Sequence, residues 1–186
     1  MFIQTESTPN PATLKFLPGQ AVLATGTADF PTEEAAQNSP LAARVFKVQG
    51  VTGVFFGPDF VTVTKDEASD WNHIKPAILG VIMEHYQSGQ PVMGEDAQNI
   101  GHKEHTGEDS EIVDQIKDLL DTRVRPAVAQ DGGDITFHGF DRGIVYLHMQ
   151  GACAGCPSST ITLKMGIENL LRHYIPEVTE VRPVAA

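Results

Sequence analysis

Long apolar runs, basic runs and cysteines are all scarce in this chain of 186 residues. The longest uninterrupted apolar stretch, residues 77–83, is far shorter than the roughly 18 residues of a membrane-spanning helix. No run of Lys and Arg offsets the formal net charge of -11, whereas surfaces that bind nucleic acid are basic. These absences predict a protein that neither spans a membrane nor binds nucleic acid.

The N-terminal segment lacks the marks of a targeting sequence. Glu6 precedes the first basic residue, Lys15, and the first arginine is Arg44, so neither a secretory signal nor an Arg-rich mitochondrial presequence is expected. Two cysteines cannot form the disulfide framework of a small secreted protein. We therefore expect a bacterial cytoplasmic protein, or the processed form of an organellar protein in the mitochondrial matrix. In such a compartment a close cysteine pair binds metal or undergoes redox chemistry.

Turn signals and apolar spacing in residues 1–87 predict a small α+β domain. The expected strands and helices occupy residues 2–7, 12–17, 40–48, 51–56, 60–65 and 71–86. Ser39 is the expected N-cap of the first helix and Pro40 its first residue, because proline suits the position where no backbone donor is needed. Pro76 predicts either a later start or a bend in the last helix.

Residues 88–109 interrupt the periodicity and predict a linker. The segment is rich in Gly, His and acids, and one lysine against five acids gives it a local charge of 1 − 5 = -4. Repulsion among these charges keeps such a segment extended and solvated. We expect a flexible acidic linker between domains at residues 1–87 and 110–186.

Residues 110–186 predict a second α+β module with the element order α-β-β-α-β. One face of its first helix carries Ile112, Ile116, Leu119, Leu120 and Val124. Arg125-Pro126 should end or kink that helix, and Asp131-Gly132-Gly133-Asp134 reads as a tight turn. The expected strands at 135–138 and 144–150 are followed by an amphipathic helix that stops at Ile175-Pro176 and by a short strand at about 178–182. The overall prediction is two small α+β domains.

Both cysteines lie in the second domain, in the sequence Cys153-Ala154-Gly155-Cys156-Pro157. Two intervening residues let both sulfurs face one point, as a metal ion or a cluster iron requires. Pro157 suits the first position of the following helix, which makes Cys156 the expected N-cap. Because a helix N-terminus stabilises a thiolate, we expect both thiols to deprotonate readily and to be ready to bind metal.

The cysteine pair alone leaves several kinds of site open. A zinc or iron–sulfur site needs four ligands, so two more must come from histidines such as His102 and His105 or from a second chain on a twofold axis. A thioredoxin-like redox pair usually has aromatic neighbours, and here the neighbours are Gly-Ala and Pro-Ser-Ser. Attachment of a c-type haem requires His at position 157, which is Pro.

The remaining histidines are better explained without a metal. His138 and His148 occupy strand positions that face away from the expected core. His85 and His173 lie near helix C-termini, where the helix dipole favours the charged ring.

The segment from about Val124 to Leu171 resembles the C-terminal domain of NifU-like (Nfu-type) iron–sulfur proteins. The matching residues are Arg125-Pro126, Asp131-Gly132-Gly133-Asp134, Gly143-Ile144-Val145, residues 151–159 around the cysteines, and residues 162–168. The first part resembles the N-terminal domain of the mitochondrial and α-proteobacterial members. That resemblance is carried by residues 2–6, 8–11, 13–16 and 39–42. Several blocks in one order make it specific, and only the linker falls outside it.

The resemblance implies an iron–sulfur cluster carrier, not an enzyme. It implies that two chains bridge a cluster, [4Fe-4S], through Cys153 and Cys156, so that cluster binding forms a homodimer. Such carriers receive the cluster from an assembly scaffold and deliver it to apo iron–sulfur proteins. A thiol redox or zinc-binding module using the same cysteine pair is the alternative, and a pure interaction adaptor is a third possibility.

Overall fold

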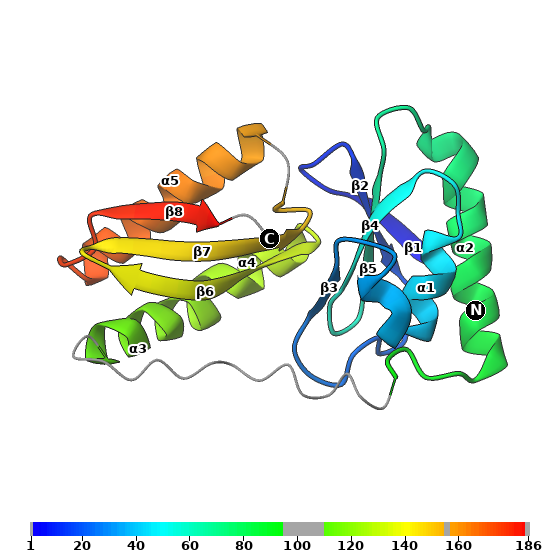
Figure 1. The fold of residues 1–186 in the computed structure, drawn as a ribbon, viewed down its shortest axis with the longest axis horizontal. Helices are drawn as coiled ribbons and strands as arrows, with labels where there is room; N and C mark the ends of the chain where they lie inside the picture. The colour runs from blue at the N-terminus through cyan, green and yellow to red at the C-terminus, as the bar shows by residue number, and fades with distance from the viewer. Residues whose placement is uncertain (1, 95–109, 155–156, 185–186) are drawn as a thin grey trace. The chain divides into compact units, whose positions relative to one another are not determined.

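The computed structural model describes residues 2–94, 110–154 and 157–184, and the chain divides into two compact units, Met1–Gly101 and His102–Ala186 (Figure 1). Each unit combines helices with one sheet, which confirms the predicted α+β class and two-domain organisation. None of the helices in these described ranges is long and apolar enough to cross a membrane. The predicted linker lies mostly outside the described residues, but Val92 and Met93 at its start pack against the core of the first unit.

The first unit is built on a five-stranded antiparallel sheet. Its strands are β1 (Gln4–Ser7), β2 (Thr13–Leu17), β3 (Ala28–Phe30), β4 (Val51–Phe56) and β5 (Val61–Lys65), in the spatial order β1-β2-β5-β4-β3. The predicted hairpin is β4 and β5, and its register pairs Phe56 with Val61. The three-residue strand β3 was not predicted, because it is too short to show an alternating pattern.

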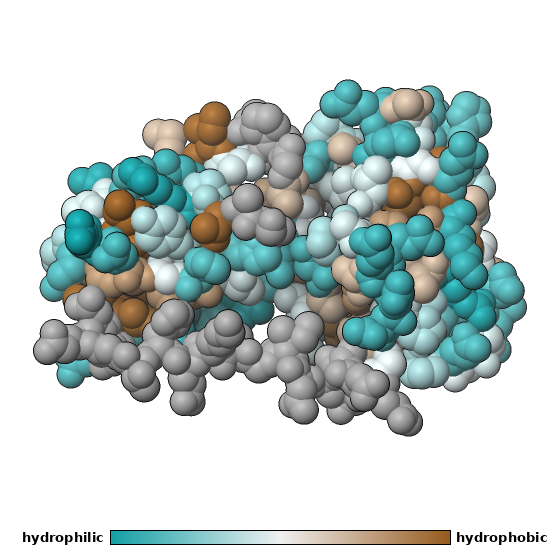
Figure 2. Space-filling model, viewed as in Figure 1, coloured by the Kyte–Doolittle hydropathy of each residue, from teal (hydrophilic) through white to brown (hydrophobic). Residues whose placement is uncertain are grey.

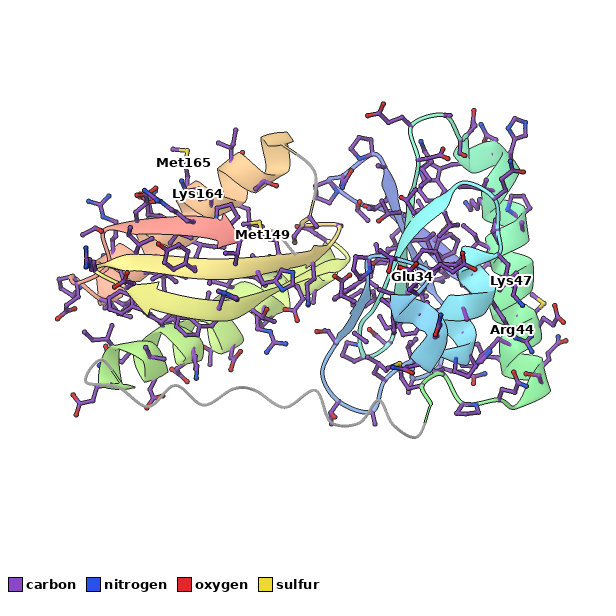
Figure 3. All side chains as sticks on the ribbon, in the orientation of Figure 1. Glu34, Arg44, Lys47, Met149, Lys164 and Met165 are labelled. Carbon is purple, nitrogen blue, oxygen red and sulfur yellow. The ribbon has the colours of Figure 1, made fainter. Side chains whose placement is uncertain are left out.

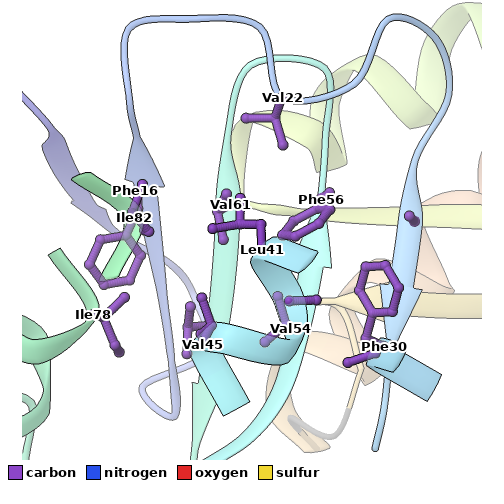
Figure 4. Close-up of a cluster of buried hydrophobic side chains, with 14 of the residues drawn as sticks. Phe16, Val22, Phe30, Leu41, Val45, Val54, Phe56, Val61, Ile78 and Ile82 are labelled. Atoms are coloured by element: carbon purple, nitrogen blue, oxygen red, sulfur yellow. The ribbon is translucent and has the colours of Figure 1, made fainter. Parts of the chain in front are cut away.

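One face of this sheet is covered by two capped helices, α1 (Pro40–Phe46) and α2 (Trp71–Ser88); a short 3₁₀ helix, η1 (Ala35–Asn38), precedes α1. The predicted cap of α1 is confirmed, since Ser39 Oγ accepts a hydrogen bond from the Ala42 amide at 3.1 Å. Asp70 caps α2, which begins at the predicted Trp71 and contains Pro76. Figure 4 shows side chains of both helices meeting those of the strands in one apolar core.

The second unit has the predicted order of elements. It contains α3 (Ser110–Leu119), a π-helical turn η3 (Leu120–Val124), α4 (Arg125–Gln130), β6 (Gly133–Asp141), β7 (Ile144–Gly151), α5 (Pro157–Tyr174) and β8 (Glu180–Val184). The first helix does not end at Arg125-Pro126. Pro126 lacks a backbone donor and crowds the preceding turn, and the wider π turn directly before it accommodates the ring while α4 continues.

The sheet of the second unit has the order β6-β7-β8. β6 and β7 are antiparallel and β7 and β8 are parallel, so the chain must cross over between the last two strands, and α5 makes that crossover. The predicted alternation in β7 is confirmed, since Val145, Leu147 and Met149 are buried in the core whereas Tyr146 and His148 are partly exposed. This topology places the cysteine segment at one end of the sheet, between β7 and α5.

Candidate functional site

Cys153 lies in a tight turn directly after β7. The turn is closed by two backbone hydrogen bonds, from the Cys153 amide to the Gln150 carbonyl at 3.3 Å and from the Ala154 amide to the Gly151 carbonyl at 3.1 Å. Gly151 has a positive φ of 61°, a conformation that glycine adopts without strain. The chain therefore reverses sharply at the end of the strand.

Two further hydrogen bonds attach this turn to its neighbours. The Ala152 amide donates to the Gly132 carbonyl at 3.2 Å, which joins the turn to the segment that leads into β6. Thr160 Oγ1 donates to the Cys153 carbonyl at 3.4 Å, which joins it to the first turn of α5. The backbone of Cys153 is thus held between the sheet and the helix.

Gly133 provides the space that the Cys153 sulfur occupies. A β-carbon at residue 133 would lie 2.5 Å from Cys153 Sγ, 2.9 Å from the Cys153 amide nitrogen and 2.8 Å from the Gln150 carbonyl oxygen. No side chain tolerates such contacts, and two of the three atoms belong to the backbone. The residue after Gly132 must therefore be glycine for the cysteine turn to pack as it does.

An ion pair fixes the strand that carries Gly133. The Arg125 guanidinium donates to both carboxylate oxygens of Asp134, from Nε and Nη2, each at 2.9 Å. Asp134 is 2% exposed, and its Oδ1 also accepts from the Ile135 amide. Arg125 makes a second, more exposed contact with Asp121 at 2.9 Å. The sequence marked residues 131–134 only as a turn, and it did not reveal that Arg125 anchors that turn.

The Cys153 thiol is buried, with 5% of the residue exposed. Burial, followed by the nearby carboxylates of Asp131 and Asp134, raises the pKa of Cys153 to about 12. The expectation of a readily deprotonated thiol is therefore wrong for Cys153, because low-dielectric surroundings and negative neighbours both disfavour a thiolate. Cys156 lies outside the described residues, and α5 begins at Pro157 as predicted.

The histidines do not join Cys153 in a cluster within the described part of the chain. His102 and His105 lie outside it, and the described residues contain no group of three or more His, Cys, Asp or Glu that could hold a metal ion. His138 is exposed, as expected, whereas His148 is half-buried and its Nε2 has no hydrogen-bond partner among the described residues.

His85 differs from the prediction made for it. The ring is completely buried, and burial, then the charge of Arg44, lowers the pKa of His85. The prediction of a charged ring favoured by the helix dipole is wrong, because desolvation outweighs the dipole at this position.

Comparisons with known proteins match both domains. Residues 3–89 match the family described as "Scaffold protein Nfu/NifU N terminal", and residues 116–182 match the "NifU-like domain". The human protein named "NFU1 iron-sulfur cluster scaffold homolog, mitochondrial" is 55% identical over 185 residues, which cover 99% of this chain and 72% of the human protein. The Drosophila sechellia protein of the same name is 54% identical, and the match covers 99% of this chain and 65% of that protein.

Solved structures give a weaker likeness. A NifU-like protein from Saccharomyces cerevisiae, solved in solution, is 30% identical with a TM-score of 0.42, and the match covers 51% of this chain and 86% of that one. Protein SAV1430 from Staphylococcus aureus is 24% identical with a TM-score of 0.40, over 44% of this chain and 99% of that one.

Proposed function

This chain belongs to the two-domain NifU-like family of iron–sulfur cluster scaffold proteins, and we propose that it carries a [4Fe-4S] cluster on Cys153 and Cys156 and transfers it to apo-proteins. The cluster is cargo that is bound and released intact. The chain only holds the cluster through its thiolates and then releases it, so it acts as a carrier and not as an enzyme.

The observation that carries the proposal is the placement of the cysteine pair. The chain has only two cysteines, two residues apart, and the described one lies in the turn between β7 and α5 of the domain that matches the NifU-like family. A cluster bound by cysteine alone needs four thiolates. Two thiolates per chain then require two chains, which meet on a twofold axis at the cluster.

The burial of Cys153 limits how the cluster is loaded. In the empty chain the sulfur faces Gly133, so the turn must move before an iron atom can reach it. That movement must break the few hydrogen bonds of the turn and take the buried side chains of Ala152 and Cys153 out of the core. A bound iron offsets the negative charges of Asp131 and Asp134, which disfavour a thiolate. A thiol that coordinates the iron therefore loses its proton.

The two domains divide the work in this proposal. Residues 110–186 hold the cluster, residues 1–87 recognise partner proteins, and residues 88–109 join them as a linker. The donor is an assembly scaffold and the recipients are apo iron–sulfur proteins. The relatives carry "mitochondrial" in their names, which favours the mitochondrial matrix over a bacterial cytoplasm as the place of action.

Anaerobic reconstitution with iron and sulfide tests the proposal. We expect the loaded protein to absorb in the visible range and to hold four iron and four sulfide per two chains, as a [4Fe-4S] cluster shared between chains requires. Cys153→Ala and Cys156→Ala should each abolish loading, whereas Ala154→Ser, at an exposed neighbour in the same turn, should leave it intact.

The same experiment separates the alternatives. Zinc bound without sulfide would identify a zinc module, and a reversible disulfide without metal would identify a thiol redox protein. Near-normal iron and sulfide in either cysteine variant would contradict the assignment of the ligands.

A further inference from the structure

Two large apolar side chains are exposed on α5 beside the cysteine turn. Ile161 and Met165 are each 60% exposed, and a spacing of four residues places them one turn apart on the same side of the helix. Figure 2 shows an apolar surface over this helix, and Figure 3 shows Met165 pointing away from the sheet. Farther along the same side the exposed residues are polar, Asn169 and Arg172. The apolar surface is therefore confined to the end of α5 that follows the cysteines.

This apolar surface begins a few residues after the cysteine pair along α5. Ile161 directly follows Thr160, whose hydroxyl group donates to the Cys153 carbonyl. At 1.5 Å per residue, Ile161 lies about 6 Å and Met165 about 12 Å along the helix axis from Pro157, the residue that follows Cys156. Whatever approaches the cluster along α5 must therefore meet these two side chains.

The charge of the helix at this end suits contact with an identical surface. The chain has a net charge of -11, yet α5 contains no acidic residue before Glu168. Its one earlier charge, Lys164, lies 3.7 Å from Glu180 in an ion pair. In a twofold contact the residues close to the axis lie near their own copies, so an acid in the turns of α5 nearest the shared site would oppose another acid. The apolar end of α5 avoids that repulsion.

The third large hydrophobic side chain exposed on α5, Tyr174, already has a partner within the chain. Tyr174, 48% exposed, lies at the far end of the helix, where the Arg123 guanidinium packs 5.5 Å from its ring centre. Ile161 and Met165 are the exposed apolar side chains of the described part of α5 that lie near the cysteines. Neither of them belongs to the apolar core of the second domain or packs against it.

We propose that Ile161 and Met165 form the apolar contact between two copies of this chain when they share a cluster. The inference rests on the proposed function, because the four-ligand site is incomplete until a second copy supplies its cysteines. The two side chains expose on the order of 200 Å², well below the roughly 800 Å² per partner of a stable interface. The contact therefore supports a dimer only together with the cluster, and the dimer separates when the cluster leaves.

The test compares Ile161→Gln/Met165→Gln with the native chain and with Tyr174→Gln, which removes an exposed apolar side chain from the other end of α5. Anaerobic sedimentation of empty and loaded protein gives the assembly state, iron analysis gives the cluster per chain, and a chelator gives the rate of cluster loss. We expect the loaded dimer of the double variant to dissociate at a protein concentration about tenfold higher than the native dimer does. We also expect it to lose its cluster about tenfold faster. Tyr174→Gln should match the native chain, and Ile161→Leu/Met165→Leu should restore the native behaviour.

Each other outcome has a definite meaning. A double variant that dimerises and retains its cluster like the native chain overturns the inference and leaves the proposed function intact. A double variant that dimerises and retains its cluster normally, but is slow in activating an apo iron–sulfur hydro-lyase, would assign the surface to recipient proteins. That result would also overturn the inference of a contact between two copies. A native chain that holds a full cluster as a monomer would refute the shared site itself. Matching circular dichroism of the empty proteins shows that the substitutions leave the fold unchanged.

Discussion

His85 in the first domain and Cys153 in the second are both buried, but different structures bury them. His85 lies in the last turn of α2, beside the backbone of Gln90 and Pro91, and neither ring nitrogen has a hydrogen-bond partner within the described residues. Cys153 lies in a turn at the end of a sheet, against the backbone of Gly133. Exposing His85 would require the chain after α2, with Val92 and Met93, to leave the core, whereas exposing Cys153 requires the turn to open and its two small buried side chains to leave theirs.

That difference separates a structural buried group from the proposed cluster ligand. The segment over His85 is held by Ser39 Oγ, which donates to the Val92 carbonyl at 2.6 Å, and by the Gly94 amide, which donates to the Asn38 carbonyl at 2.7 Å. It carries Val92 and Met93 into the core, so its release would cost apolar burial as well as hydrogen bonds. The turn that carries Cys153 contributes two small buried side chains, Ala152 and Cys153, of which Cys153 belongs to the apolar core of the second domain. Under the proposed function, the smaller buried surface at Cys153 suits a ligand that must be loaded and released.

The largest effect should come from filling the space beside Cys153. Gly133→Ala places a methyl group in contact with Cys153 Sγ and with two backbone atoms that cannot rotate away, so we expect the second domain to lose about 3 kcal/mol. Cluster loading should fall with it. The change is measured by calorimetry together with fluorescence of Trp71, the only tryptophan, which reports on the first domain and should not change.

Gly139→Ala is the matched control, because a β-carbon there meets nothing within 4 Å. Equal stability of the two alanine variants would contradict the packing of Cys153 on Gly133.

The next effect concerns the two carboxylates that Arg125 contacts. Arg125→Met leaves the buried carboxylate of Asp134 without its guanidinium partner, and we expect the second domain to lose about 3 kcal/mol. Asp121→Asn removes only the exposed contact of the same arginine and should cost less than about 0.5 kcal/mol. Urea unfolding followed by circular dichroism measures both. Similar losses in the two variants would show that burial of Asp134 does not decide the strength of the pair.

The sequence predicted those elements whose ends are set by local chemistry. Ser39-Pro40 begins α1, Pro157 begins α5, and the turn at 57–59 joins β4 to β5, because capping and turn residues act within a few positions. It predicted that the helix ends or kinks at Arg125-Pro126, but not the π turn through which the helix continues, since a π turn depends on how the helix packs. It also ended β6 too early, because a bulge between Phe137 and Gly139 lets the strand continue to Asp141.

The same limit applies to the site. The spacing of the cysteines located a candidate ligand pair and its place before α5. The burial of Cys153 depends on Gly133, twenty residues earlier in the chain, and on a strand that Arg125 anchors. Contacts between distant residues leave no local pattern, so the state of the thiol could not be predicted from the motif.

A smaller effect is expected in the first domain at Ser39. Ser39→Ala removes the cap of α1 and the hydrogen bond to the Val92 carbonyl, so we expect a loss of about 1.5 kcal/mol, measured by urea unfolding on Trp71 fluorescence. Asp70→Ala removes an exposed cap of α2 that makes no such second contact, and should cost about 0.5 kcal/mol. A larger loss at Asp70 would show that the segment after α2 contributes little to stability.

The smallest effect is a dependence of first-domain stability on pH that comes from His85. Burial lowers the pKa of His85, so the folded ring stays neutral where the unfolded ring, with its ordinary pKa near 6.5, takes up a proton. The unfolded state then binds more protons, and stability falls as the pH drops below about 6.5 until the folded ring also titrates. One proton limits the slope to about 1.4 kcal/mol per pH unit. Above pH 7.5 the contribution of His85 should be constant.

His85→Leu tests the origin of this slope, because it retains an apolar side chain and removes both unpartnered nitrogens. Free energies of unfolding from Trp71 fluorescence, measured between pH 5 and pH 8, should fall less steeply toward low pH in His85→Leu than in the native chain. His73→Gln, at an exposed position of the same helix, should follow the native curve. Subtracting the two curves cancels the carboxylates that titrate in both. A native slope retained in His85→Leu would mean that His85 binds protons equally in the folded and unfolded states, so that the slope comes from other groups.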